Sequence, residues 1–376
     1  MASDRPAPLD EYPIHQVPLS IRHVATGDRN AYDRCIFQVF DHAGRALLIA
    51  GLGVYPNAGV IDAFATLTTP DGSLLAVRAS DALTDDRMHL AVGPFTITVD
   101  EPLKRFRLTC AADPDDPDSL SYDLTWTAAF PALWEPHHTM RTGDRLTLEA
   151  TRFVQAGTPE GTIRAGGQDL AVAAADWTGT RDRSWGIRPI RGEENGRAAA
   201  EHLPEGFHWL WCPVRFDDRF VMVVLQENPE GYRTLNQAVE IRADGRPDAQ
   251  LGWPHADITY RSGTRHPERA VLHLTDTARK PLELHAETLV SSPLAVGAGY
   301  PPAEDWQHGT WQGRGWTDRR AYDLTDPAAN PMAAYGVTDH AARFTLDGRT
   351  GYGIFEHGSF GRHDPSGFTG YDSVAP

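Results

Sequence analysis

The stretch that decides the fold is residues 208–226, which read HWLWCPVRF-DD-RFVMVVLQ. Two apolar runs rich in aromatic and β-branched residues flank Asp217 and Asp218, a pair that favours a tight turn. Side chains two apart on a strand share a face, so Trp209 and Trp211 project to the same side. The stretch predicts a β-hairpin with one indole-rich face.

The same pattern continues in both directions along the chain. Further apolar runs bounded by turn residues lie at 47–50, 60–68, 74–78, 95–99, 106–110, 122–127, 146–154, 238–242, 257–260, 271–274, 282–289 and 343–346. Helical periodicity is confined to residues 197–203, a short stretch. Many short strands with regular turns predict an all-β protein built as sandwiches or barrels.

The length of 376 residues exceeds the usual range of a single domain. The polar, glycine-containing segment 191–196 is a natural division, because such a segment does not pack as a strand. We therefore expect an N-terminal β domain over 1–190 and a C-terminal β domain over 191–376, each able to close its own barrel.

The bulk composition narrows the class of partner. A net charge of -16 argues against nucleic acid and anionic membranes, since phosphate binding requires a basic face. No apolar run is long enough to span a bilayer, and the first residues lack the basic and apolar regions of a signal peptide. The three cysteines have no CxxC spacing, which favours buried reduced thiols. We expect a cytoplasmic protein whose partner is an apolar small molecule.

Residues 179–188, GTRDRSWGIR, combine an acid, three arginines and a tryptophan. If this run is extended, Asp182 and Ser184 lie on one face, while Arg183 and Trp185 lie on the other. Desolvation in a dry cavity would raise the carboxyl pKa and make Asp182 a general acid. Alternatively, Asp182 is ionised and pairs with a nearby arginine as a buried structural clamp.

The run Asp182-Arg183-Ser184-Trp185-Gly186 resembles the Asp-His-Asn-Trp-Gly type of motif in the carotenoid 1,2-hydratase (hydroxyneurosporene synthase) superfamily, which includes fungal Diels–Alderases. The resemblance implies two lipocalin-like β domains, with the ligand pocket near their interface. It also implies that Asp182 matches the acid thought to protonate an alkene in the hydratases. Arg183 stands where the family has His, and Ser184 where it has Asn or Gln.

Other side chains could complete a substrate site. Trp185, Trp209 and Trp211 would stabilise a carbocation, although large aromatics are also common core fillers. His357 would be a second proton carrier, on the face opposite Glu356.

Two further groups of residues complete the predicted site. Tyr55 and Asn57 would fix a ligand oxygen at a barrel mouth, or simply satisfy turn backbone. Arg183 would contact the substrate. Metal-ligand spacing, dinucleotide fingerprints and P-loops are missing from the sequence, so we expect neither a metal nor a cofactor.

These observations favour a cofactor-independent lyase or isomerase of the hydratase or dehydratase type. Asp182 would protonate an alkene or a leaving hydroxyl of an isoprenoid-, steroid- or polyketide-like substrate, in an aromatic pocket. Two alternatives remain open: a terpenoid or polyketide cyclase or pericyclase, and a non-catalytic carrier of hydrophobic ligands.

Overall fold

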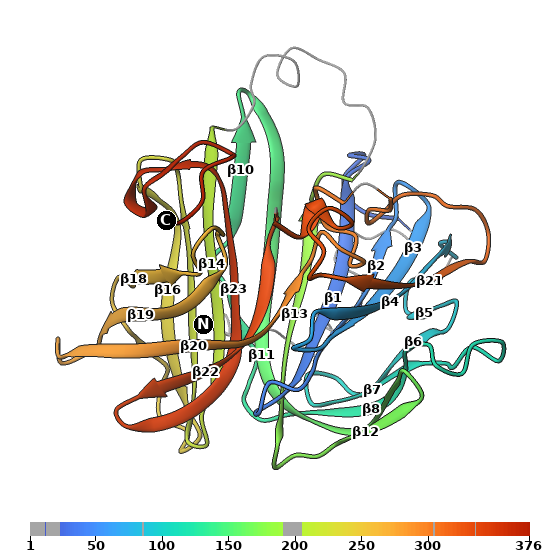
Figure 1. The fold of residues 1–376 in the computed structure, drawn as a ribbon, viewed down its shortest axis with the longest axis horizontal. Helices are drawn as coiled ribbons and strands as arrows, with labels where there is room; N and C mark the ends of the chain where they lie inside the picture. The colour runs from blue at the N-terminus through green and yellow to red at the C-terminus, as the bar shows by residue number, and fades with distance from the viewer. Residues whose placement is uncertain (1–11, 13–22, 85, 191–204, 304, 335) are drawn as a thin grey trace.

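The computed structural model describes residues 12, 23–84, 86–190, 205–303, 305–334 and 336–376. The chain is all-β, with two curled antiparallel half-barrel sheets consistent with two lipocalin-like domains (Figure 1), which confirms the predicted fold class. Two short 3-10 turns, η2 (Pro331–Ala334) and η3 (Asp364–Ser366), are the helical elements of the described residues. The helical stretch expected at 197–203 lies outside them. Nothing helical in the described chain has the length and apolar character to cross a bilayer.

The N-terminal sheet has fourteen strands, in the order β21-β4-β3-β2-β1-β13-β11-β8-β7-β6-β5, with β9, β10 and β12 also pairing with β11. Their bounds are β1 (Ala31–Asp41), β2 (Leu47–Tyr55), β3 (Val60–Thr68), β4 (Ser73–Ala82), β5 (Ala91–Val92), β6 (Phe95–Glu101), β7 (Arg105–Cys110), β8 (Ser121–Ala128), β9 (Leu133–Trp134), β10 (His138–Thr142), β11 (Arg145–Ala165), β12 (Gln168–Val172), β13 (Trp177–Ile187) and β21 (Trp316–Asp323).

The C-terminal sheet has ten strands, in the order β17-β16-β15-β14-β23-β22-β20-β19-β18, with β24 pairing with β23. The predicted hairpin at 208–226 is present as β14 and β15, which pair antiparallel. The strand bounds are β14 (Gly206–Arg215), β15 (Arg219–Glu227), β16 (Arg233–Arg242), β17 (Ala249–Gln250), β18 (His255–Tyr260), β19 (Pro267–Thr275), β20 (Pro281–Pro293), β22 (Thr338–Leu346), β23 (Arg349–His363) and β24 (Phe368–Thr369).

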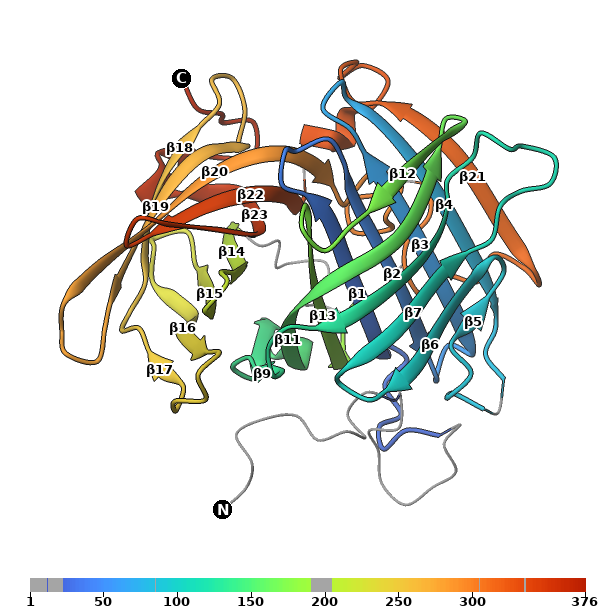
Figure 2. The ribbon, with the colours of Figure 1, turned by 90° about the horizontal axis from the view of Figure 1, so that it is seen from below.

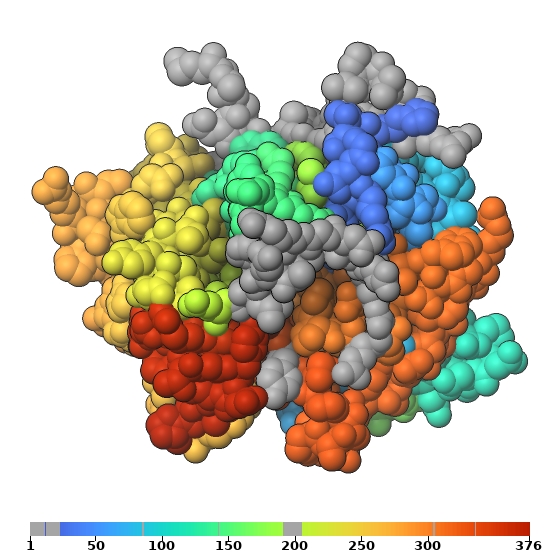
Figure 3. All heavy atoms as spheres, turned by 90° about the horizontal axis from the view of Figure 1, so that it is seen from above, coloured from blue at the N-terminus to red at the C-terminus, as the bar shows by residue number. Residues whose placement is uncertain are grey.

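One strand from late in the chain belongs to the first sheet. β21 pairs antiparallel with β4 at the sheet edge, and Arg78 of β4 forms ion pairs with Asp305 and Asp318. In the space-filling view, this late segment (orange) spreads over the half of the molecule built by the first strands (Figure 3). These contacts join the two halves of the chain. The division into two domains at residue 190 remains a proposal.

Three apolar clusters hold the structure together. One fills the first barrel around Phe37, Phe106 and Trp126, and a second fills the C-terminal barrel around Leu210 and Phe344. The third lies between the sheets and includes apolar side chains of both halves, such as Ile36, Val154, Trp209 and Trp211.

Strands β11 and β13 of the first sheet and β14 of the second lie near the middle of the molecule, where the two curled sheets face each other (Figure 2). Each has one face inside its own barrel and one face toward the other half, because side chains alternate along a strand. Residues on the outward faces of these strands are therefore placed to form a site shared by both halves.

Candidate functional site

A cavity of about 590 Å³ lies between the two halves. Its walls come from β11 and β13 of the first sheet and from β14, β15 and β23 of the second. The volume is in the range typical of small-molecule pockets. Of the predicted site residues, Asp182, Trp209 and Trp211 line this cavity.

Asp182 projects from β13 toward the cavity, and apolar neighbours surround its base. Its cross-strand partners are Ile36 and Val154, which are both buried. This burial raises the pKa of the Asp182 carboxyl to about 7, although the positive charges of Arg152 and Arg34 act in the opposite direction. No hydrogen bond or ion pair to the Asp182 side chain is found in the described part of the chain. The carboxyl is therefore near half-protonation at neutral pH and available to a ligand.

The opposite face of β13 belongs to the interior of the first barrel. There the Arg183 guanidinium forms an ion pair with Asp33, with 3.0 Å between Nη2 and Oδ1. The Trp185 ring packs edge-on against Trp134 and Phe153 at centroid distances of 5.8 and 6.4 Å. The buried clamp considered for Asp182 thus exists, but Arg183 and Asp33 form it. Neither Arg183 nor Trp185 lines the cavity.

The two indoles of β14 face the cavity with their N–H groups directed to carboxylates. Trp211 Nε1 donates to Glu135 Oε1 at 2.8 Å, and Trp209 Nε1 donates to Glu356 Oε1. The Trp209 ring also stacks on His138 at 5.7 Å. Each ring is fixed in orientation by its hydrogen bond to a carboxyl oxygen.

Arg152 connects these groups. Its Nη1 donates to Glu135 Oε2 at 3.0 Å, while its guanidinium lies 5.5 Å from the Trp209 ring centroid. Burial raises the pKa of Glu135, and the positive charge of Arg152 opposes this. Arg152 thus holds Glu135 in place as the acceptor for Trp211.

Glu356 lines the cavity and lies beside a second carboxyl group. It pairs across the strands with Asp339, whose Oδ2 accepts a hydrogen bond from Gln38 Nε2 at 3.3 Å. Burial and the adjacent Glu356 raise the pKa of Asp339 well above its ordinary value. Asp339 therefore holds its proton more tightly than an ordinary aspartate.

His357 points away from the cavity, into the second barrel. Its Nε2 is 3.2 Å from the Tyr260 hydroxyl, and its ring lies 5.2 Å from that of His208. Burial lowers its pKa well below the ordinary value, so the imidazole is neutral. Because side chains alternate along β23, Glu356 faces the cavity and His357 faces away from it. His357 is therefore not part of the site proposed below.

His208 and His363 belong to the same interior group. Together with Glu227 they offer ligand atoms within 4.8 Å of one another, a donor set suited to a divalent metal such as zinc. His363 Nε2 already contacts Glu227 Oε2 at 2.9 Å, and Arg233 Nε contacts Glu227 Oε1 at 2.5 Å. The protein thus supplies its own partners for most of these groups, although it could hold a metal here.

Tyr55 and Asn57 lie outside the cavity lining. Asn57 Nδ2 donates to the backbone carbonyls of Thr26 and Asp28 at 2.7 and 2.8 Å. This agrees with the alternative role considered from the sequence, in which Asn57 satisfies the backbone of a turn. Tyr55 is buried beside Ile190 in a small apolar cluster.

The sequence placed Arg188 on the face of Asp182 without giving it a role, and it gave no sign that Arg34, Arg152 or Tyr300 would join the cavity lining. For Glu356 a signal existed: it alternates with His357 on one strand. Arg34 and Arg152 meet only because both pair across from Ser184 of β13. No local sequence pattern predicts that two residues so far apart in the chain lie side by side.

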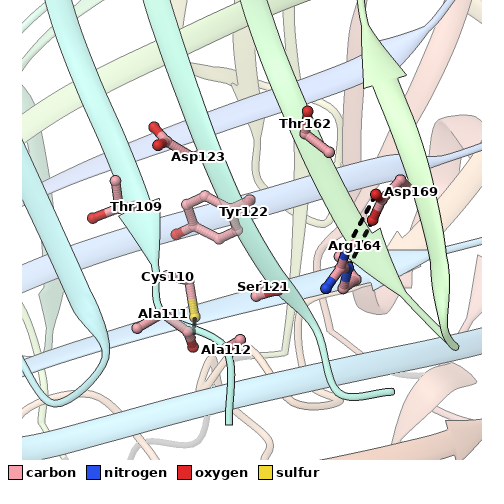
Figure 4. A pocket seen from close by; sticks show the side chains of 10 residues that line it. All are labelled: Thr109, Cys110, Ala111, Ala112, Ser121, Tyr122, Asp123, Thr162, Arg164 and Asp169. Atoms are coloured by element: carbon pink, nitrogen blue, oxygen red, sulfur yellow. Dashed lines mark hydrogen bonds and ion pairs between the residues drawn. The ribbon is translucent and has the colours of Figure 1, made fainter. Parts of the chain in front are cut away.

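A shallower hollow of about 350 Å³ lies at the edge of the first sheet, between β7, β8, β11 and β12 (Figure 4). Of its charged members, Arg164 and Asp169 pair with each other at 2.7 Å, Asp123 pairs with Arg107, and all three lining residues are largely exposed. Burial raises the pKa of the Cys110 thiol to about 12, which makes it unreactive. This hollow holds no activated group among its described residues.

A family model, described as a family of unknown function (DUF8625), matches residues 7–369. No curated protein matches the chain. Among solved structures, a candidate AttH protein from Nitrosomonas europaea is similar, with 15% identity, a TM-score of 0.53, and coverage of 89% of this chain and 93% of that chain. Kievitone hydratase from Nectria haematococca is similar at 12% identity and a TM-score of 0.50, with coverage of 95% and 93%. At these identities the likeness establishes a shared fold.

Proposed function

The chain belongs to this family of unknown function (DUF8625), and we propose that it is a cofactor-independent hydro-lyase that adds water to, or removes it from, an apolar substrate. The observation that carries the proposal is Asp182: a carboxyl group with its pKa raised to about 7, open to a cavity whose walls include Trp209 and Trp211. The fold shared with a hydratase is a supporting fact.

In the hydration direction, Asp182 donates its proton to one alkene carbon, and the π electrons form the new C–H bond. The neighbouring carbon becomes a cation. Water attacks this carbon, the C–O bond forms, and the released proton returns to the Asp182 carboxylate. Dehydration follows the same steps in reverse. A pKa near the working pH suits a group that must both give and accept the proton.

The indoles stabilise the cation between these steps. Trp209 and Trp211 line the cavity, and the quadrupole of an indole ring attracts positive charge. Because Glu356 and Glu135 accept their N–H groups, the rings are held in place before the charge develops. This arrangement requires no reorganisation during the reaction.

The pH dependence follows from the raised pKa. The protonated form of Asp182 is the acid, so the hydration rate is expected to be constant below pH 7 and to fall about tenfold per pH unit well above it. A rate that stays constant from pH 6 to 9 would contradict this role.

The test is incubation of the protein with a panel of terpenoid, steroid and polyketide alkenes in H₂¹⁸O, followed by mass spectrometry. We expect a product heavier than its substrate by one molecule of labelled water, absent with Asp182→Asn. A product isomeric with its substrate and free of label would identify a cyclase or pericyclase instead. Recovery of every compound unchanged, with one retained by the protein, would identify a carrier.

A further inference from the structure

Two arginines of the cavity carry charge that the protein does not neutralise. Arg34 of β1 and Arg188, just after β13, both line the cavity. Neither forms an ion pair with a carboxylate in the described parts of the chain, whereas Arg152 pairs with Glu135. Arg34 is only 4% exposed, and its Nε is buried without a hydrogen-bond partner. A buried guanidinium in this state is costly, so a partner from outside is expected.

The two guanidinium groups converge on one aromatic ring. The Cζ atoms of Arg34 and Arg188 lie 4.8 and 5.4 Å from the ring centroid of Tyr300. The positive charge of Arg34, after burial itself, lowers the pKa of Arg188. The two guanidinium groups repel each other, and an anion placed between or beside both would relieve that repulsion.

Acids on the cavity wall do not cancel this charge. Glu227 pairs with Arg233 and His363, and Glu356 adjoins Asp339 and accepts the Trp209 N–H. Asp182 is near Arg34 electrostatically, but its carboxyl is only half ionised at neutral pH.

We propose that this cavity takes amphipathic substrates that carry an anionic oxygen group, a carboxylate or a phosphate, and that Arg34 and Arg188 bind that group beside Tyr300. Arginine suits this role because its planar donors match both groups with two hydrogen bonds. The apolar body of the substrate then lies against the indoles of β14. The inference rests on the proposed use of this cavity for a substrate, and it narrows the substrate class from apolar molecules to apolar acids.

Anion binding would also prepare the acid. Arg34 opposes protonation of Asp182, so an anion that neutralises Arg34 favours the protonated carboxyl. Binding of the substrate would thereby increase the protonated fraction of Asp182, the group that donates the proton. Uptake of a fraction of a proton on binding at pH 7, measured by calorimetry in buffers of different ionisation enthalpy, is the expected sign.

The test uses three probes of equal chain length: dodecanoate, dodecyl phosphate and dodecan-1-ol. Binding to the full-length protein is measured by quenching of tryptophan fluorescence, below the concentration at which the probes form micelles. We expect at least one charged probe to bind about tenfold or more tightly than the alcohol. The tighter charged probe identifies the group.

The variant Arg188→Gln is expected to lose that preference while its affinity for the alcohol changes less than about twofold. Arg34→Gln provides a second variant with the same expectation. Arg107→Gln, at an exposed arginine that pairs with Asp123, is the matched control and should behave as the wild type.

Equal affinity of the wild type for all three probes would overturn the inference. So would a preference for the charged probes that survives in both variants. Asp182→Asn separates this inference from the proposed function: it should keep the anion preference and lose ¹⁸O incorporation. If the wild type prefers the charged probes but incorporates ¹⁸O into no alkene, the hydro-lyase proposal is refuted and the anion site is still supported.

Discussion

The interior of the second barrel and the cavity between the two halves both bury polar groups, but they treat charge differently. In the barrel interior, burial keeps His208 and His357 neutral. In the cavity, Asp182 of β13 has no ion-pair partner among the described residues, and its carboxyl retains a proton near neutral pH. The contrast teaches that burial alone does not mark a functional site. Buried charge that the protein leaves uncompensated does.

The largest expected effect is on turnover. Asp182→Asn removes the proton donor, and general acid catalysis typically contributes about 10²–10⁴-fold in rate. We expect a loss of that size in ¹⁸O incorporation, with the circular dichroism spectrum unchanged. Asp123→Asn, at an exposed acid paired with Arg107, is the control and should retain full activity. Turnover by Asp182→Asn within twofold of the wild type would refute the assignment.

A substitution on the opposite face of β13 should lower the stability of the fold. Arg183→Leu removes a buried ion-pair partner of Asp33, and we expect a loss of about 3–5 kcal/mol in the free energy of unfolding, measured with urea. Replacing both partners by leucine should cost less than the single change, because the Asp33 carboxylate is then removed together with its partner. A loss below about 1 kcal/mol in the single variant would show that the pair is not a structural clamp.

The acid itself should lower stability as the pH rises. A raised folded-state pKa means that the folded protein binds the Asp182 proton more tightly than the unfolded chain does. Stability from this group is therefore present below about pH 4 and is lost between pH 4 and 7. We expect Asp182→Asn to match the wild type near pH 4 and to exceed it by about 2–4 kcal/mol at pH 8.

That comparison is made by urea unfolding of both proteins across this pH range. A difference that does not change with pH would show that the folded and unfolded chains bind the proton equally.

The smallest effect on turnover is expected at His357, the neighbour of the cavity residue Glu356. His357→Gln should change turnover less than about threefold, because the ring lies inside the second barrel. Glu356→Gln, one position away, should reduce turnover about tenfold by weakening the acceptor of Trp209. Equal losses in the two variants would show that the faces of β23 are not functionally distinct.

Local patterns were sufficient for the fold. The hairpin at 208–226 and the alternation of β13 follow from side-chain chemistry and a period of two residues, and both are present in the structure. Alternation also placed Asp182 and Ser184 on one face. The same rule separates Glu356 from His357, but it cannot say which of the two meets the cavity.

The remainder of the site depends on strand register between distant segments. Arg34 and Arg152 reach the cavity because β1 and β11 flank β13 with both residues opposite Ser184. Tyr300 comes from a segment between β20 and β21 that has no strand pattern of its own. Such meetings are set by tertiary packing, and neither spacing nor composition encodes them locally.

The central claim is that Asp182 holds a proton at neutral pH inside an indole-walled chamber. Its most direct test is a pH titration of the aspartate carboxyl carbons by ¹³C NMR in the full-length protein, with Asp182→Asn used to assign the resonance. The account predicts a titration midpoint about 7 for Asp182. A midpoint at or below the ordinary aspartate value of about 4 would contradict it.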